Sequence, residues 1–244
     1  MQSETLNSAI IIIGNEILSG KTQDLNIQFI AKELGSIGIR LQEVRVIPDI
    51  EEAIISAVNE LRKKYTYVFT TGGIGPTHDD ITAQTMAKAF DDEYILHKEA
   101  KEIMEEFLLK NNCPLTQGHI RMAHMPSRSE SLLNRETGAP GFKIDNVFVM
   151  AGVPSIMQAM FGEVKKYLKH GKPIISKSVD AEISENAIAE QFSDLQDKYP
   201  SIEMGSYPFK RDDIWGTSLV LRGDNPELID KAMKELKEIL AKVE

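Results

Sequence analysis

The chain has 244 residues, of which 42% are hydrophobic and 27% charged, so it can form one large domain or a medium domain with a small one. Its formal net charge of -9 argues against nonspecific nucleic-acid binding, which needs clustered Lys and Arg, and its single cysteine excludes an internal disulfide. The longest apolar run is too short to cross a bilayer and the N-terminus carries no export signal, so we expect a cytoplasmic protein that does not contact membranes.

The first two thirds of the chain alternate apolar strands with amphipathic helices, which is typical of βαβ units and a mainly parallel sheet. We predict strands at residues 9–13, 41–47, 67–70 and 147–151. Predicted helices begin near Asp24, Asp49, Thr82, His97 and Pro154, and Asp49 is in a position to cap its helix. Between Asn111 and Phe142 the chain is rich in Pro, Gly, Asn and Ser, which predicts an irregular, functional loop region.

Residues 170–173 predict a linker that divides the chain into domains 1–169 and 170–244. The second part is predicted as a strand (174–183), a helix (185–196), two strands near 201–207 and 215–221, and a closing helix (226–243). This βαββα order indicates a small α+β domain. The loop between its two later strands is expected to contain Lys210 and Arg211.

A glycine-rich segment, Thr70-Thr-Gly-Gly-Ile-Gly75, lies between a predicted buried strand and the helix near Thr82. This position is the carboxyl end of the sheet, where open α/β folds bind ligands. Glycines let the backbone approach a phosphate, and free N–H groups stabilise its charge, although a plain tight turn has the same composition. Asp79 and Asp80 strengthen the functional interpretation, because carboxylates beside a phosphate are costly unless a metal or a proton-transfer role compensates them.

Five blocks in chain order, spanning about residues 8 to 168, resemble the molybdopterin-binding fold family, which includes MogA and MoaB proteins and the N-terminal domain of CinA-type proteins. The blocks are Gly14 to Gly20 with Asp24 and Asn26, Pro48-Asp49, GGIGP with DDIT, Asn134 to Gly141, and Gly152-Val-Pro154 with Met157 and Met160. The resemblance implies a three-layer α/β fold around a mainly parallel sheet, followed here by the small α+β domain.

The CinA-like branch is favoured by GGIGPTHDD, by Gly152-Val-Pro154, and by Met204-Gly-Ser-Tyr-Pro208, which is similar to the second domain of stand-alone CinA-like proteins. A full-length CinA-type protein continues into a deamidase domain. We do not expect that activity here, because the sequence stops at Glu244.

The resemblance implies catalytic or metal-binding roles for Asp49 and Asp80, with Glu16 as a further ligand or proton acceptor. The alternatives are helix N-caps for the two aspartates and a cap or surface-pair role for Glu16. Asp79 is expected to share a divalent cation (Mg, Mn or Co) with Asp80, or to be solvated. The residues expected around the nucleotide and its phosphates are Gly14, Asn15, Thr71, Gly72, Gly73, Gly75, Pro76, Thr77, Thr82, Asn134, Gly138, Pro140 and Gly141. Asn15 departs from the aspartate more common in MogA-like proteins, which weakens any role that needs a carboxylate there.

The function that the resemblance implies first is metal-dependent hydrolysis of nucleoside diphosphate linkages, with ADP-ribose as substrate and FAD-type dinucleotides as a second choice. The alternative is a molybdopterin-binding or adenylyl-transfer protein of molybdenum-cofactor assembly, and a third is a non-catalytic interaction module. The first two place the same loops around a phosphorylated nucleotide or pterin ligand, so the fold does not choose between them. The resemblance also implies a homo-oligomer.

Overall fold

The computed structural model describes residues 6–243, which form two compact units. The larger unit contains the described residues up to 34 together with 39–169, and the smaller contains 35–38 together with the described residues from 170 onward. None of the described helices is long and apolar enough to cross a bilayer.

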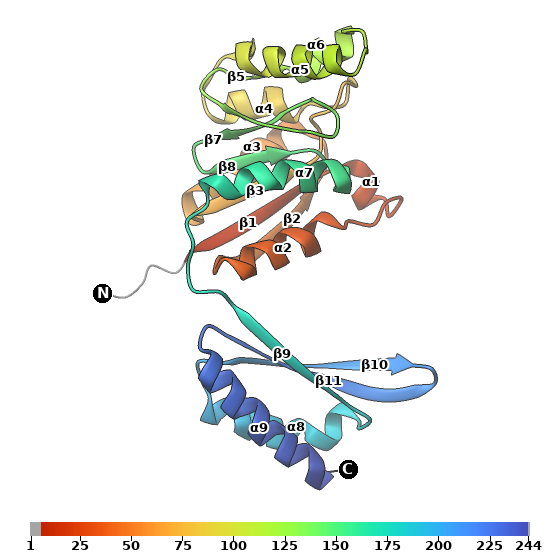
Figure 1. Cartoon of the computed structure of the whole chain (residues 1–244), viewed down its shortest axis with the longest axis vertical. Helices are drawn as coiled ribbons and strands as arrows, with labels where there is room; N and C mark the ends of the chain where they lie inside the picture. Colours follow the sequence, from red (N-terminus) through yellow and green to blue (C-terminus); the bar gives the residue numbers. More distant parts are fainter. Residues whose placement is uncertain (1–5, 244) are drawn as a thin grey trace, which may run out of the picture. The chain divides into compact units, whose positions relative to one another are not determined.

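The larger unit is built on a six-stranded sheet in the order β2-β1-β3-β8-β7-β6 (Figure 1). Its strands are β1 (Asn7–Ile13), β2 (Arg40–Ile47), β3 (Tyr67–Thr71), β6 (Glu130–Leu132), β7 (Gly141–Ile144) and β8 (Val147–Met150). The four strands β2, β1, β3 and β8 run parallel, and β7 and β6 continue the sheet antiparallel. The predicted mainly parallel sheet is therefore confirmed.

The burial of each strand follows its place in the sheet. Residues 9–13 of the inner strand β1 are all buried, as a strand covered on both faces requires, and this explains their unbroken apolar sequence. The edge strand β2 alternates instead, and Val44 and Val46 each remain 38% exposed.

Helices cover both faces of the sheet and complete the three layers (Figure 1). The helices of the larger unit are α1 (Asn15–Leu18), α2 (Asn26–Ser36), α3 (Glu51–Lys64), α4 (Thr82–Ala89), α5 (Lys98–Lys110), α6 (Gln117–Met122) and α7 (Pro154–Val164), which a 3-10 turn, η1 (Lys165–Tyr167), extends. Ile11 and Ile13 belong to a buried core cluster that also contains apolar residues of α3, α4 and α5. On the other face, Phe69 contacts Phe161 of α7, which in turn contacts Phe29 of α2.

The segment between Asn111 and Phe142 is more ordered than predicted. It contains α6, β6 and the short strand β5 (His124–Pro126), which pairs antiparallel with β4 (Tyr94–Leu96). Thr116 begins α6 with a capping box, because its hydroxyl accepts from the N–H of His119 while the His119 ring accepts from the N–H of Thr116. The expectation of an irregular segment was therefore only partly correct, because the Pro-, Gly- and Asn-rich composition concealed the capping box at Thr116.

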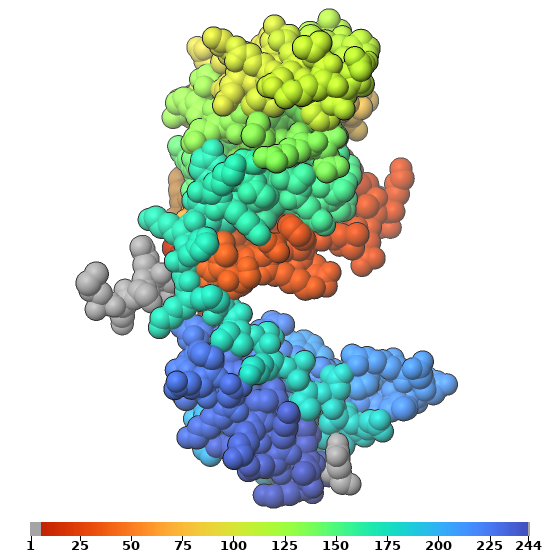
Figure 2. All heavy atoms as spheres, in the orientation of Figure 1, coloured from red at the N-terminus to blue at the C-terminus, as the bar shows by residue number. Residues whose placement is uncertain are grey.

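The smaller unit confirms the predicted βαββα order. It consists of β9 (Ile175–Ala181), α8 (Glu185–Lys198), β10 (Glu203–Arg211), β11 (Ile214–Gly223) and α9 (Pro226–Val243), with an antiparallel sheet in the order β10-β11-β9. Lys210 and Arg211 lie inside β10 and not in the loop as predicted, because Asp212 and Asp213 form the turn at φ values of 49° and 66°. Positive φ at both central residues matches a two-residue hairpin turn. Figure 2 shows the end of this hairpin projecting from the rest of its unit, and Trp215, on β11, is 68% exposed.

Candidate functional site

The parallel strands of the larger unit bring the predicted site residues to one edge of the sheet. Gly14 follows β1, Asp49 follows β2 after one residue, Gly72 follows β3, and Gly152 follows β8 after one residue. Because parallel strands present their carboxyl ends together, segments that are up to 138 positions apart in the sequence share this edge.

The glycine loop, residues 72–76, requires glycine at its first two positions. Gly72 has a φ of +106° and Gly73 a φ of +68°, which disfavour other residues. A Cβ on Gly72 would lie 2.1 Å from the carbonyl oxygen of Ile13, and one on Gly73 would lie 2.2 Å from the Oγ1 of Thr82. The loop therefore packs closely on β1 and on the first turn of α4.

The glycine loop presents unused backbone donors. Among the described residues, the N–H groups of Gly73, Ile74 and Gly75 donate to no protein acceptor, whereas that of Gly72 is bound to the Met150 carbonyl at 3.1 Å. Successive free N–H groups beside a helix N-terminus form an anion-binding concavity.

Two buried threonines lie at the same place. Thr71 ends β3 and is 1% exposed, and Thr82 begins α4 and is fully buried. Within the described part of the chain, neither hydroxyl has a hydrogen-bond partner, although the Thr82 N–H binds the Gly73 carbonyl at 2.9 Å. Unpaired buried hydroxyls cost free energy, so these two are candidates for a structural water or a ligand contact.

Asp49 lies on one flank of the glycine loop. Its Oδ2 accepts from the N–H of Asn15 at 2.9 Å, and its Oδ1 is 3.6 Å from the position that a Cβ on Gly73 would occupy. It does not cap α3 as proposed from the sequence, because the cap position is Ile50 and no side chain caps this helix. The Asp49 carboxylate is bonded to the N–H of Asn15 instead of to an N–H at the start of α3.

Asp80 lies on the other flank of the glycine loop, beside Gly75. Its Oδ2 accepts from the N–H of Thr77 at 2.8 Å and from the Thr77 hydroxyl at 2.6 Å, and it is 2.6 Å from the position of a Cβ on Gly75. The alternative role as an N-cap is also wrong here, since α4 has Ile81 at its cap position and no side-chain cap. Asp80 closes the turn that begins at Thr77.

Asp79 shares the Thr77 hydroxyl with Asp80. The Oγ1 of Thr77 is 2.5 Å from the Oδ1 of Asp79, but one hydroxyl proton serves one carboxylate at a time. This hydrogen bond, aided by a backbone N–H, lowers the pKa of Asp79. The described residues hold no cluster of three or more His, Cys, Asp or Glu that could bind a metal, so Asp79 and Asp80 need oxygens from a ligand to complete a cation site.

Glu16 and Asn15 lie on the short helix α1, both exposed. The carboxylate of Glu16 folds over Gly14, where a Cβ would lie 2.4 Å from its Oε1. Among the described residues, no group is hydrogen-bonded to the side chain of Asn15 or of Glu16.

The segment 134–141, also predicted to bind the nucleotide, uses its polar groups internally. Asn134 is 3% exposed; its amide donates to the Thr137 hydroxyl at 2.6 Å and the Ala139 carbonyl at 3.0 Å, and its oxygen accepts from the N–H of Glu136 at 3.0 Å. A Cβ on Gly138 would lie 2.4 Å from the Phe107 ring. Asn134 and Gly138 therefore shape the segment, and its role in nucleotide binding stays a prediction.

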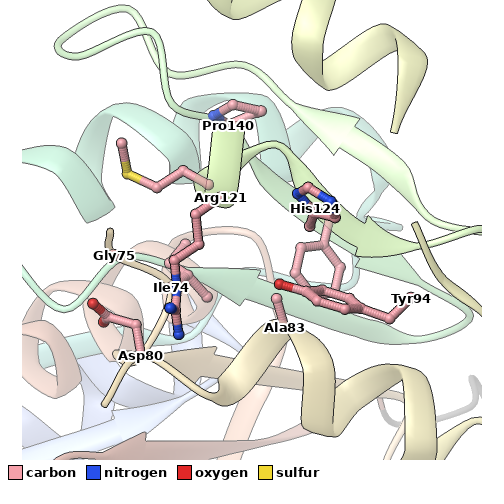
Figure 3. Close-up of a pocket in the computed structure, with 10 residues that line it drawn as sticks. Ile74, Gly75, Asp80, Ala83, Tyr94, Arg121, His124 and Pro140 are labelled. Carbon is pink, nitrogen blue, oxygen red and sulfur yellow. The ribbon is translucent and has the colours of Figure 1, made fainter. Parts of the chain in front are cut away.

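The glycine loop borders a pocket that is lined by predicted site residues and by several residues that no sequence motif had marked. Its lining residues are Ile74, Gly75, Asp80, Ala83, Tyr94, Arg121, Met122, His124, Pro140 and Phe142 (Figure 3). Pro140 thus joins the glycine loop as predicted for this segment. Tyr94, Arg121 and His124 were missed because no motif marks them; the capping box before α6 was the available signal for the element that carries Arg121.

Comparison with known proteins matches residues 9–170 to the family described as "Probable molybdopterin binding domain" and residues 173–243 to "FAD synthase, middle domain". A protein of Archaeoglobus fulgidus is 32% identical over 95% of this chain and 96% of its own length. A probable FAD synthase of Caenorhabditis elegans is 28% identical over 96% of this chain, which spans 50% of that protein. The crystal structure of the protein CinA from Thermoplasma acidophilum, 28% identical, superimposes with a TM-score of 0.61 over 68% of this chain and 99% of that one.

Proposed function

This chain belongs to the family of probable molybdopterin-binding domains, and on that premise we propose that its glycine loop binds the phosphate of a pterin or nucleotide ligand, as a molybdopterin-binding or adenylyl-transfer protein. One observation carries the proposal: the consecutive N–H groups of Gly73, Ile74 and Gly75 have no acceptor within the described chain. Fixed backbone donors bind a phosphate without reorganisation and stabilise charge that develops on it during group transfer.

The carboxylates beside the loop restrict the charge state of the ligand that the site can bind. Asp49 and Asp80 lie on opposite flanks of the loop, beside Gly73 and Gly75. Carboxylates repel a bare phosphate, so the ligand is favoured either with a bound divalent cation or with protons that the carboxylates accept. We propose that Asp79 and Asp80 hold such a cation together with the phosphate oxygens of the ligand.

A second candidate function is hydrolysis of ADP-ribose or FAD-type dinucleotides. It is favoured by one observation, that Asp49 and Asp80 flank the loop and cap neither helix. It takes second place because the family match names a molybdopterin-binding domain and because the described residues form no three-ligand metal cluster of their own.

Binding is tested by titrating AMP, ADP-ribose, ATP and FAD, with and without Mg²⁺, while recording amide resonances and melting temperature. We expect the resonances of Gly73, Ile74 and Gly75 to shift, and a ligand at a hundredfold its Kd to stabilise the fold by about 2.7 kcal/mol. Gly73→Ala should abolish binding. Gly20→Ala is the matched control, because Gly20 also has a positive φ, +73°, but nothing lies within 4 Å of its Cβ position. Unshifted loop resonances with every ligand would overturn the proposal.

The two activities give different products. Adenylyl transfer from ATP to molybdopterin releases pyrophosphate, whereas hydrolysis of ADP-ribose with Mg²⁺, Mn²⁺ or Co²⁺ gives AMP and ribose 5-phosphate. We expect pyrophosphate release that depends on added molybdopterin. Formation of AMP and ribose 5-phosphate without such release would put the hydrolase first.

We also propose a homo-oligomer. The edge strand β2 has backbone groups available for pairing on one side and leaves Val44 and Val46 each 38% exposed. Light scattering of the purified chain tests this, and a monomeric mass at micromolar concentration would contradict it.

A further inference from the structure

A larger cavity lies beside the pocket of the glycine loop and shares Tyr94, Arg121 and His124 with it. Its volume is about 520 Å³, within the range of about 300 to 1,000 Å³ of small-molecule sites. The residues that line it and carry the argument are Pro76, Gln84, Tyr94, Gln117, Arg121 and His124. The glycine loop reaches this cavity at Pro76, and the cavity is large enough to hold more of a ligand.

One wall of the cavity is aromatic. In the antiparallel pair β4 and β5, Tyr94 is opposite Pro126 and His124 is opposite Leu96, so the two rings occupy diagonal positions. Their centroids are 5.5 Å apart and their planes are inclined by 42°. Tyr94 is 37% exposed, which leaves part of its ring uncovered at the cavity. An uncovered aromatic ring is a stacking surface for a planar heterocycle.

The polar side chains that line the cavity can form hydrogen bonds with the edge of a planar heterocycle. The Nδ1 of His124 is 2.8 Å from the Ile120 carbonyl, which only accepts, so this nitrogen carries a proton and Nε2 of the neutral ring accepts. Gln84 and Gln117 contribute amide donors and acceptors, and the guanidinium of Arg121 contributes donors. None of the described residues that line this larger cavity is acidic.

We propose that this cavity binds the planar heterocycle of the same ligand whose phosphate lies on the glycine loop, with the ring stacked on Tyr94. The inference rests on the proposed function and adds to it a ring-recognition site. Figure 3 shows Arg121 extending toward Asp80 and the Tyr94 hydroxyl, between the loop and the aromatic wall. Its Nη2 donates to the His78 carbonyl at 3.4 Å, which ties α6 to the segment that follows the glycine loop.

The test compares ligands that share a phosphate but differ in the ring: AMP, FMN and ribose 5-phosphate, titrated calorimetrically against the full chain. We expect AMP or FMN to bind at least tenfold more tightly than ribose 5-phosphate. Tyr94→Leu should remove about tenfold of that preference and leave the affinity for ribose 5-phosphate within twofold, while Tyr94→Phe keeps the preference. Tyr207→Leu is the matched control, since Tyr207 lies on β10 and is 50% exposed.

The outcomes separate this inference from the proposed function. If all three ligands bind equally tightly, or Tyr94→Leu leaves their ratio unchanged, the ring site is wrong while phosphate binding stands. If none binds, the proposed function fails and this inference fails with it. Gln84→Ala, an exposed change on α4, provides a second variant and should lower only the affinity for the ring-bearing ligands. The preference between AMP and FMN identifies the ring as a purine or as a larger fused system.

Discussion

The segments 72–76 and 134–141 of the larger unit both contain glycines and a proline, but they differ in whether their polar groups are free or hydrogen-bonded. In the first, three consecutive N–H groups have no acceptor among the described residues, and the carboxylates of Asp49 and Asp80 lie beside it. In the second, Asn134 is buried and bonded to its own segment, and Gly138 makes room for Phe107. Glycine permits close packing in both segments, on β1 and α4 in the first and on Phe107 in the second, and only the first has free backbone donors beside it.

The difference between the two segments lies in their polar groups and not in their glycines. Both need glycine at positive φ, as Gly73 and Gly138 show with +68° and +78°. What separates them is whether the neighbouring polar groups are free, as in 72–76, or bonded within the segment, as around Asn134. Mutations in the two segments should therefore have different consequences, on stability in one and on binding in the other.

The largest expected effect is the loss of stability caused by Asn134→Ala. The change leaves the Thr137 hydroxyl, the Ala139 carbonyl and the Glu136 N–H without their partner, and we expect the free energy of unfolding of the larger unit to fall by about 3 kcal/mol. Asn15→Ala is the matched change beside the glycine loop and should alter stability by less than about 0.5 kcal/mol. Urea denaturation of both variants measures the difference, and equal losses would remove the distinction between the two segments.

A similar contrast is expected between Gly138→Ala and Gly20→Ala. Both glycines have positive φ, which costs about 1 kcal/mol with alanine, but only the Gly138 Cβ would meet a neighbour, the Phe107 ring at 2.4 Å. Displacing that ring adds about 1 to 2 kcal/mol. We expect the melting temperature of Gly138→Ala to be clearly the lower of the two. If the values coincide, the segment is free to move away from Phe107.

The expected effect of Asp80→Asn is a smaller one, on the affinity for AMP, and its sign depends on whether a divalent cation is present. The asparagine oxygen can still accept from the N–H of Thr77, so the loop should keep its shape. In EDTA the variant should bind AMP about fivefold more tightly than the native chain, because about 1 kcal/mol of charge repulsion is removed. In Mg²⁺ the order should reverse if Asp80 helps to hold the ion. Tighter binding by the variant in both conditions, measured by calorimetry, would exclude Asp80 as a cation ligand.

The smallest expected effect is a change in the titration of Asp79 in Thr77→Val. The Thr77 hydroxyl stabilises the carboxylate, so its removal should raise the pKa of Asp79 toward the ordinary aspartate value. In the native chain this interaction stabilises the fold above the unfolded pKa and is lost as the pH falls through the lower folded pKa. Carboxyl NMR titration measures it, with Asp180 as an internal control because Ser218 and Arg211 lower its pKa independently. An unchanged Asp79 titration would assign the shift to the backbone.

The sequence predicted the parts of the site that depend on chain order. Strand β1, the loop at Gly72 and the helix at Thr82 follow from an apolar run, glycines and helical spacing, and the structure places them at one edge of a mainly parallel sheet. It could not separate Asp49 and Asp80 from helix caps, because a cap and a turn-closing carboxylate have the same local sequence. Tyr94 and His124 were not predicted because their grouping depends on the pairing of β4 with β5, which no local pattern specifies, and Arg121 was not predicted because the capping box that begins α6 was overlooked.

The single cysteine and the single tryptophan lie in different units, so they provide a natural pair of sites for measuring the distance between the units. Cys113, the single cysteine, is exposed in the larger unit, and Trp215, the single tryptophan, is exposed on the hairpin of the smaller unit. An acceptor dye on the thiol would therefore form a donor–acceptor pair with the one indole, with no residue to add or remove. Any change in the separation of the two units, for example when a phosphorylated ligand binds, would appear as a change in the fluorescence of a single donor.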